Sequence, residues 1–78
     1  MDTRKTIDRV IEEKRKGIRA RNPEGERLHE DLGLDSLDVM EIIMECEREL
    51  NVRIPDSMCV GLKVKEDLYR LFDEVENS

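Results

Sequence analysis

Few residues of this 78-residue chain could take part directly in chemistry. They are a single histidine, two cysteines and one serine in an acidic setting: His29, Cys46, Cys59 and Ser36. A serine hydrolase needs a base beside the nucleophile and backbone donors for the oxyanion. The segment around Ser36, LGLDSLD, lacks the GxSxG pattern, and no predicted strand precedes it. The sequence therefore disfavours hydrolysis at Ser36, and we expect no catalytic residues.

A metal site is equally poorly supported. The chain has one histidine and no CxxC spacing, whereas structural zinc needs four such ligands. A calcium loop beginning at Asp31 would place Ser36 where glycine is needed and Ile42 where the bidentate glutamate is needed. We expect no metal, and we interpret Cys46 and Cys59 as small apolar residues rather than a disulfide.

Periodicity predicts the elements that must hold Ser36. Apolar residues recur at helical spacing in residues 3–18, capped by Asp2 or Thr3, and from about residue 63 to 75. They also recur in residues 36–50, a helix opened by Asp35 as its cap and closed near Asn51. The segment 19–31 reads as a long loop, and residues 56–61 as a short helix capped by Asp56, with Met58 or Val60 either lining a pocket or packing. The fold class is all-α, a small four-helix bundle with three longer helices and a short third one.

Composition restricts the partners of the chain. The formal charge is −6, split into +1 for residues 1–31 and −7 for residues 32–78. Such a surface disfavours nucleic acid and favours partners with basic docking patches. No apolar run approaches the ~20 residues that span a bilayer, and the first residues do not resemble a signal peptide. We expect a cytoplasmic protein with no membrane partner.

The helix predicted over 36–50 has two apolar faces. One is the expected core stripe, formed by Val39, Ile42, Ile43, Cys46 and Leu50. The opposite side carries Leu37, Met40 and Met44, edged by carboxylates at Asp38, Glu41, Glu45 and Glu49. A bundle this small cannot easily bury both sides of one helix, so part of the second stripe should remain exposed as a docking surface.

The string EDLGLDSLDVMEIIMECERELNVRIPD, residues 30–56, closely resembles the acyl carrier protein family. In that family the pattern DLG-x-DSL opens the second helix and its serine carries 4′-phosphopantetheine. The resemblance implies a single acyl carrier domain over residues 1–78 with Ser36 as the attachment site. It also implies a non-enzymatic role, in which a phosphopantetheinyl transferase loads the arm from coenzyme A and the arm's thiol holds acyl groups. An exposed helix N-terminus, with its dipole and free N–H groups, suits that phosphodiester.

The resemblance also implies a docking surface for acyl-transferring enzymes with basic patches, on a chain that acts as a monomer. The residues that match it are Asp35, Leu37, Asp38, Met40, Glu41, Met44 and Glu47. Arg48 follows Glu47 where the family often has an acid. Three interpretations stay open: a fatty-acid carrier, a specialised polyketide or lipid-modification carrier, and a carrier-like interaction module with Ser36 unmodified.

Overall fold

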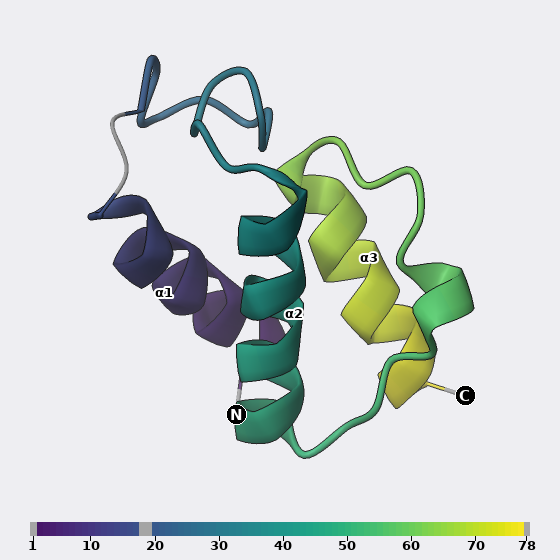
Figure 1. Ribbon diagram of the computed structural model, residues 1–78. Coiled ribbons are helices and arrows are strands. Elements are labelled where there is room, and N and C mark those ends of the chain that lie inside the picture. The colour runs from purple at the N-terminus through teal and green to yellow at the C-terminus, as the bar shows by residue number, and fades with distance from the viewer. Residues whose placement is uncertain (1, 18–19, 78) are drawn as a thin grey trace.

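The computed structural model describes residues 2–17 and 20–77. Its elements, in chain order, are α1 (Thr3–Arg15), α2 (Ser36–Leu50), the 3-10 turn η1 (Asp56–Met58) and α3 (Lys65–Glu76). α1 packs against both α2 and α3. Figure 1 shows the long α1–α2 connection crossing one end of the bundle. The all-α prediction is confirmed, and none of the described helices is long and apolar enough to cross a membrane.

The four-helix count is wrong in detail, because the predicted third helix is one 3-10 turn. Pro55 precedes this turn, and Asp56 is its first residue rather than a side-chain cap. Gly61, with φ of +70°, follows three residues after the turn ends. A 3-10 segment rarely extends beyond three or four residues, so a helix of this type between Pro55 and Gly61 is expected to stay this short.

α2 agrees with its predicted limits, whereas α1 is shorter than predicted. Asp2 caps α1 by accepting a hydrogen bond from the Arg4 N–H at 3.0 Å. The helix then ends at Arg15, where Lys16 and Gly17 close the last turn through bonds to earlier carbonyls. Ile18, predicted to extend the apolar stripe of this helix, lies outside the described residues.

One core joins all three helices. α1 contributes Ile7, Val10 and Ile11, while α3 contributes Leu68, Leu71 and Phe72. α2 buries Val39, Ile42, Ile43 and Cys46, which confirms the predicted core stripe apart from the partly buried Leu50. Cys46 and Cys59 are both free thiols. Met58 packs against this core, whereas Val60 is 73% exposed.

The connection before α2 belongs to the core although it forms no regular helix. Leu28, Leu32 and Leu34 are each at most 1% exposed. The same segment pairs with the approach to α3: the Leu28 N–H donates to the Lys63 carbonyl at 2.9 Å, beside a single antiparallel bridge between Arg27 and Val64. This pairing goes with an extended backbone at Val64, and α3 begins at Lys65, slightly later than the start predicted near Lys63.

A buried carboxylate organises the turn that carries these leucines. Asp31 accepts hydrogen bonds from the Arg27 N–H at 3.0 Å and from the Arg27 guanidinium at 3.0 and 3.2 Å. The Arg27 side chain, followed by its backbone N–H, lowers the pKa of Asp31. The resulting stabilisation is present at neutral pH and is lost as the pH falls through that lowered pKa.

Gly25 is required by this arrangement. A Cβ placed there would lie 2.4 Å from the carboxyl carbon of Asp31, whereas one at Gly17 would meet only the Lys14 carbonyl oxygen at 3.9 Å. We expect Gly25→Ala to lower the free energy of unfolding by about 1–3 kcal/mol, as overpacking does. Gly17→Ala, the control, should leave it unchanged or raise it slightly. Urea denaturation of both variants measures the difference, and equal stabilities would contradict the prediction.

Candidate functional site

Ser36 is the first residue of α2 and its side chain is exposed. The preceding segment anchors Ser36, because Leu34, two residues earlier, is buried in the core. Within the described residues the Ser36 hydroxyl makes no hydrogen bond, so it remains available to an attacking or modifying partner. The turn thus presents an exposed hydroxyl two residues after a buried leucine.

Two carboxylates form a reciprocal cap around Ser36. Asp35 accepts from the Asp38 N–H at 2.8 Å, and Asp38 accepts from the Asp35 N–H at 3.0 Å. The bond from the Asp38 N–H is the main reason that the pKa of Asp35 is lowered. The predicted capping role of Asp35 is confirmed. The capping role of Asp38 was not predicted, although an acidic side chain three residues after the cap is the signal of a capping box.

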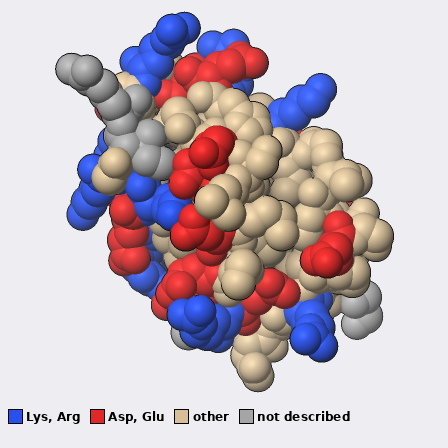
Figure 2. Space-filling view, in the orientation of Figure 1, with Lys and Arg blue, Asp and Glu red and all other residues tan. Residues whose placement is uncertain are grey.

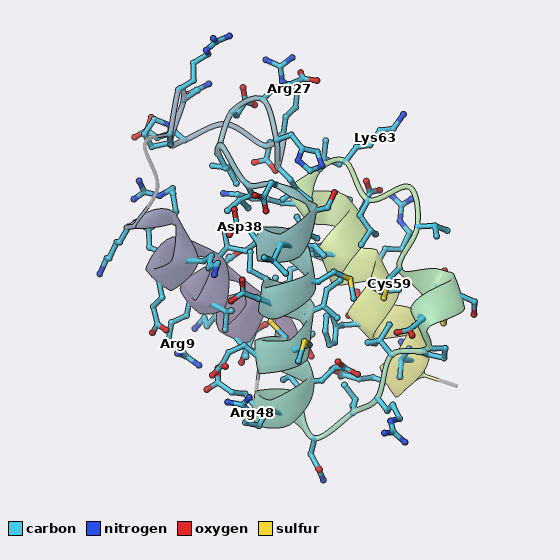
Figure 3. The ribbon with its side chains drawn as sticks, viewed as in Figure 1. Arg9, Arg27, Asp38, Arg48, Cys59 and Lys63 are labelled. Atoms are coloured by element: carbon cyan, nitrogen blue, oxygen red, sulfur yellow. The ribbon has the colours of Figure 1, made fainter. Side chains whose placement is uncertain are left out.

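A surface cleft of about 370 Å³ adjoins Ser36. Its other lining residues come from the α1–α2 connection, from α2 and from the loop after η1: His29, Val39, Met40, Cys59, Gly61, Leu62 and Lys63. Figure 3 shows Cys59 and Lys63 on the α3 side of α2, whereas Asp38 extends toward α1. Burial raises the pKa of the Cys59 thiol, so it remains protonated at neutral pH. His29, which lies in the segment predicted to be a loop, is exposed and is bonded through Nδ1 to the Leu34 carbonyl.

The second apolar stripe of α2 is exposed as predicted. Leu37, Met40 and Met44 are 67%, 38% and 56% exposed. In Figure 2, carboxylates gather over the α1–α2 side of this face with basic side chains among them, and uncharged surface lies beside them. Exposed large apolar side chains next to charge are typical of a contact surface.

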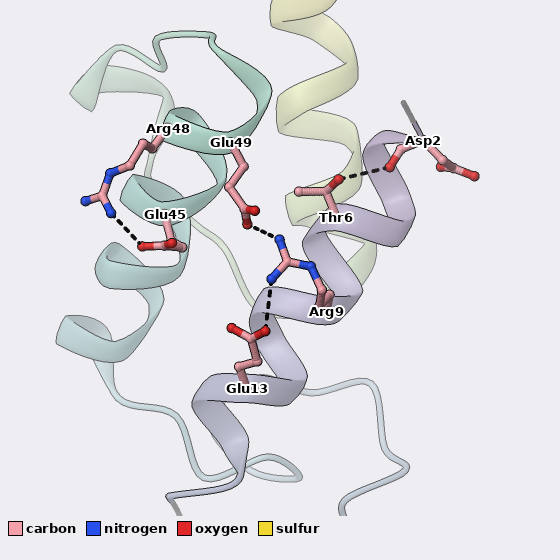
Figure 4. Close-up of polar contacts among 7 residues, drawn as sticks. All are labelled: Asp2, Thr6, Arg9, Glu13, Glu45, Arg48 and Glu49. Carbon is pink, nitrogen blue, oxygen red and sulfur yellow. Dashed lines mark hydrogen bonds and ion pairs between the residues drawn. The ribbon is translucent and has the colours of Figure 1, made fainter.

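The carboxylates along α2 were predicted to edge a docking surface. In the structure, several of them form ion pairs with basic side chains of the same chain. Lys14 Nζ lies 3.0 Å from Glu41 Oε2 and 3.6 Å from Asp38 Oδ1. Figure 4 shows Arg9 between Glu13 and Glu49, and Arg48 against Glu45 at 3.2 Å. Glu47 accepts from the Ile54 N–H at 2.7 Å and so ties the helix to the following loop.

Sequence reasoning missed Lys14 in this surface. Its one signal was that Lys14 interrupts the apolar stripe of the first helix.

Among the described residues, no group of three His, Cys, Asp or Glu side chains is placed to hold a metal ion. The site therefore consists of an exposed hydroxyl, an adjoining cleft, and a mixed apolar and charged face.

Comparison with known proteins assigns this arrangement to a family. The family model described as "Phosphopantetheine attachment site" matches residues 18–71, which include Ser36, its cleft and α2. The chain belongs to this phosphopantetheine attachment family. The comparison with solved structures found no match.

Curated relatives carry the name acyl carrier protein. One from Phytoplasma australiense is 50% identical over 42 residues, covering 54% of this chain and 55% of the relative. One from Clostridium perfringens (strain 13 / Type A) is 44% identical over 45 residues, covering 58% and 59%. One from Campylobacter jejuni (strain 81-176) is 44% identical over 50 residues, covering 64% and 65%. The chain thus spans little more than half the length of the first of these relatives.

The cap around Ser36 should contribute measurably to stability. Asp35→Ala removes the acceptor for the Asp38 N–H, and loss of such an N-cap typically costs about 1 kcal/mol. Asp56→Ala is the matched control, because η1 has no side-chain cap bond. Thermal or urea unfolding should show a loss for Asp35→Ala alone. Equal losses in the two variants would show that the cap does not stabilise α2.

Proposed function

We propose that this protein is an acyl carrier in which the Ser36 hydroxyl is joined to 4′-phosphopantetheine and acyl groups travel as thioesters on that arm. The observation that carries the proposal is the placement of Ser36 as the exposed first residue of a capped helix. That placement lies within the region matched by the phosphopantetheine attachment model. When attached, the arm supplies the thiol, so the chain itself needs no base or oxyanion hole.

The residues around Ser36 fit such a group. The hydroxyl is accessible, and the adjoining cleft of about 370 Å³ has apolar walls at Val39, Met40 and Leu62. Such walls can cover part of an apolar chain, while the cleft stays open to solvent. Coenzyme A is the source of the arm. A separate phosphopantetheinyl transferase joins the Ser36 oxygen to the phosphorus of the arm as the pyrophosphate bond of coenzyme A breaks, with adenosine 3′,5′-bisphosphate as the leaving group and loss of the hydroxyl proton.

We place docking of acyl-handling enzymes on the exposed face of α2. Leu37, Met40 and Met44 supply apolar contact area, and Asp38 and Glu41 stand beside them to meet basic groups. Asp35 and Glu47 contribute chiefly by holding the two ends of the helix, because their carboxylates accept backbone hydrogen bonds. The face and Ser36 are therefore supported by the same helix.

The first test is covalent loading. Wild-type protein incubated with coenzyme A, Mg²⁺ and a broad-specificity phosphopantetheinyl transferase should gain one phosphopantetheinyl group by intact mass. Ser36→Ala should gain none, whereas Ser57→Ala, at an exposed serine of η1, should load as the wild type does. Failure of the folded wild type to load with several transferases would leave the unmodified interaction module as the better function.

The second test concerns charge on the docking face. Glu41→Lys should slow association with the transferase at low salt, because charges around an interface act mainly on the encounter rate. Glu74→Lys makes the same charge change at an exposed position of α3 and is the control. Stopped-flow association at two salt concentrations measures both variants. Equal slowing by the two would show that only net charge matters and that the docking face lies elsewhere.

A further inference from the structure

Lys14 lies at the edge of the docking face although it belongs to α1. Its ammonium contacts Glu41 at 3.0 Å and Asp38 at 3.6 Å, so one cation serves two carboxylates of the face. The bond to Glu41 is the main reason that the pKa of Lys14 is raised, which keeps the side chain charged. The local charge that a partner meets at this point is therefore −1 rather than −2.

A partner approaching these carboxylates must meet Lys14. Lys14, Glu41 and Met44 line one groove of about 370 Å³ between α1 and α2, with Val10 and Ile42 among its other walls. Met44 also belongs to the exposed apolar stripe. A side chain that covers Met44 and reaches Glu41 thus enters the space beside the lysine ammonium.

The contact is poorly suited to a purely stabilising role. The side chains of Lys14 and Glu41 are 29% and 49% exposed, and exposed ion pairs of this kind contribute little to folding. Asp38 has a second bond, from the Asp35 N–H, that holds it in place without the lysine. Removing the Lys14 charge should therefore leave the fold intact and two carboxylates uncompensated.

We propose that Lys14 is a specificity-determining residue of the docking face, because it holds Asp38 and Glu41 in an internal ion pair that a partner's cation must replace. The partner that fits is an enzyme surface with apolar cover for Leu37, Met40 and Met44 and a basic side chain aimed at Glu41. A surface that offers positive charge alone gains little, since its cation only exchanges with Lys14. This inference rests on the proposed function and adds to it the kind of partner selected.

The test compares Lys14→Gln with Lys16→Gln. Both remove one positive charge, but Lys16 is exposed just beyond the end of α1 and is not part of the contact with Asp38 and Glu41. Association with a phosphopantetheinyl transferase that has a basic docking face is followed by stopped flow. At low salt, Lys14→Gln should associate about three to five times faster than Lys16→Gln, as expected for one unit charge at about 4 Å in water. The difference should vanish at high salt.

A second probe separates this inference from the proposed function. A tetra-arginine peptide, titrated against the unloaded proteins and followed by the Glu41 amide in NMR spectra, should bind Lys14→Gln about threefold more tightly than Lys16→Gln. Equal affinities, or equal association rates with the transferase, would overturn the role of Lys14. Tighter peptide binding by Lys14→Gln in a protein that never loads at Ser36 would overturn the carrier function and leave the internal ion pair established.

Discussion

Three buried leucines from a segment without regular helix complete the small core and determine where α2 begins. Leu28, Leu32 and Leu34 fill the end of the bundle where α2 begins. A chain of this length has a small core, so a free linker there would leave the helices without enough buried apolar surface. The Asp31–Arg27 bonds and the backbone pairing with Lys63 hold the leucines in place. Because Leu34 is fixed, Ser36 two residues later is exposed at a defined point and not on a mobile loop.

Helix ends that are set by neighbouring residues were predicted correctly, whereas ends that are set by contacts between residues far apart in sequence were not. α2 was predicted at both ends because its signals are local: Asp35 caps the start, and Asn51 takes a left-handed conformation at the end. The start of α3 was placed too early because the bridge between Arg27 and Val64 joins residues far apart in sequence, which periodicity does not report. The short third helix was overestimated because the segment before Gly61 forms only the 3-10 turn Asp56–Met58, and segments of this kind seldom extend further.

The same distinction applies to the candidate site. The motif put Ser36 at the start of a helix, and the two opposite apolar stripes of that helix predicted that Leu37, Met40 and Met44 would be exposed. Both predictions depend on the sequence of one helix alone. The pairing of the carboxylates could not be predicted in this way. It depends on how α1 packs against α2, which brings Arg9 to Glu49 and Lys14 to Glu41. A lysine that interrupts an apolar stripe was visible in the sequence, but its partner was not.

The cap also changes how the helix end can act on an attached group. The sequence suggested that the N–H groups at the start of α2 would suit a phosphodiester. In the structure the Asp38 N–H donates to the Asp35 carboxylate, and the Asp35 N–H donates to the Asp38 carboxylate. Two of the donors that a helix N-terminus offers an anion are thus already used, and two carboxylates stand beside the hydroxyl. On the proposed function, the arm is therefore attached at a rigid point without being held tightly there. That combination suits a group that must reach the active sites of several different enzymes.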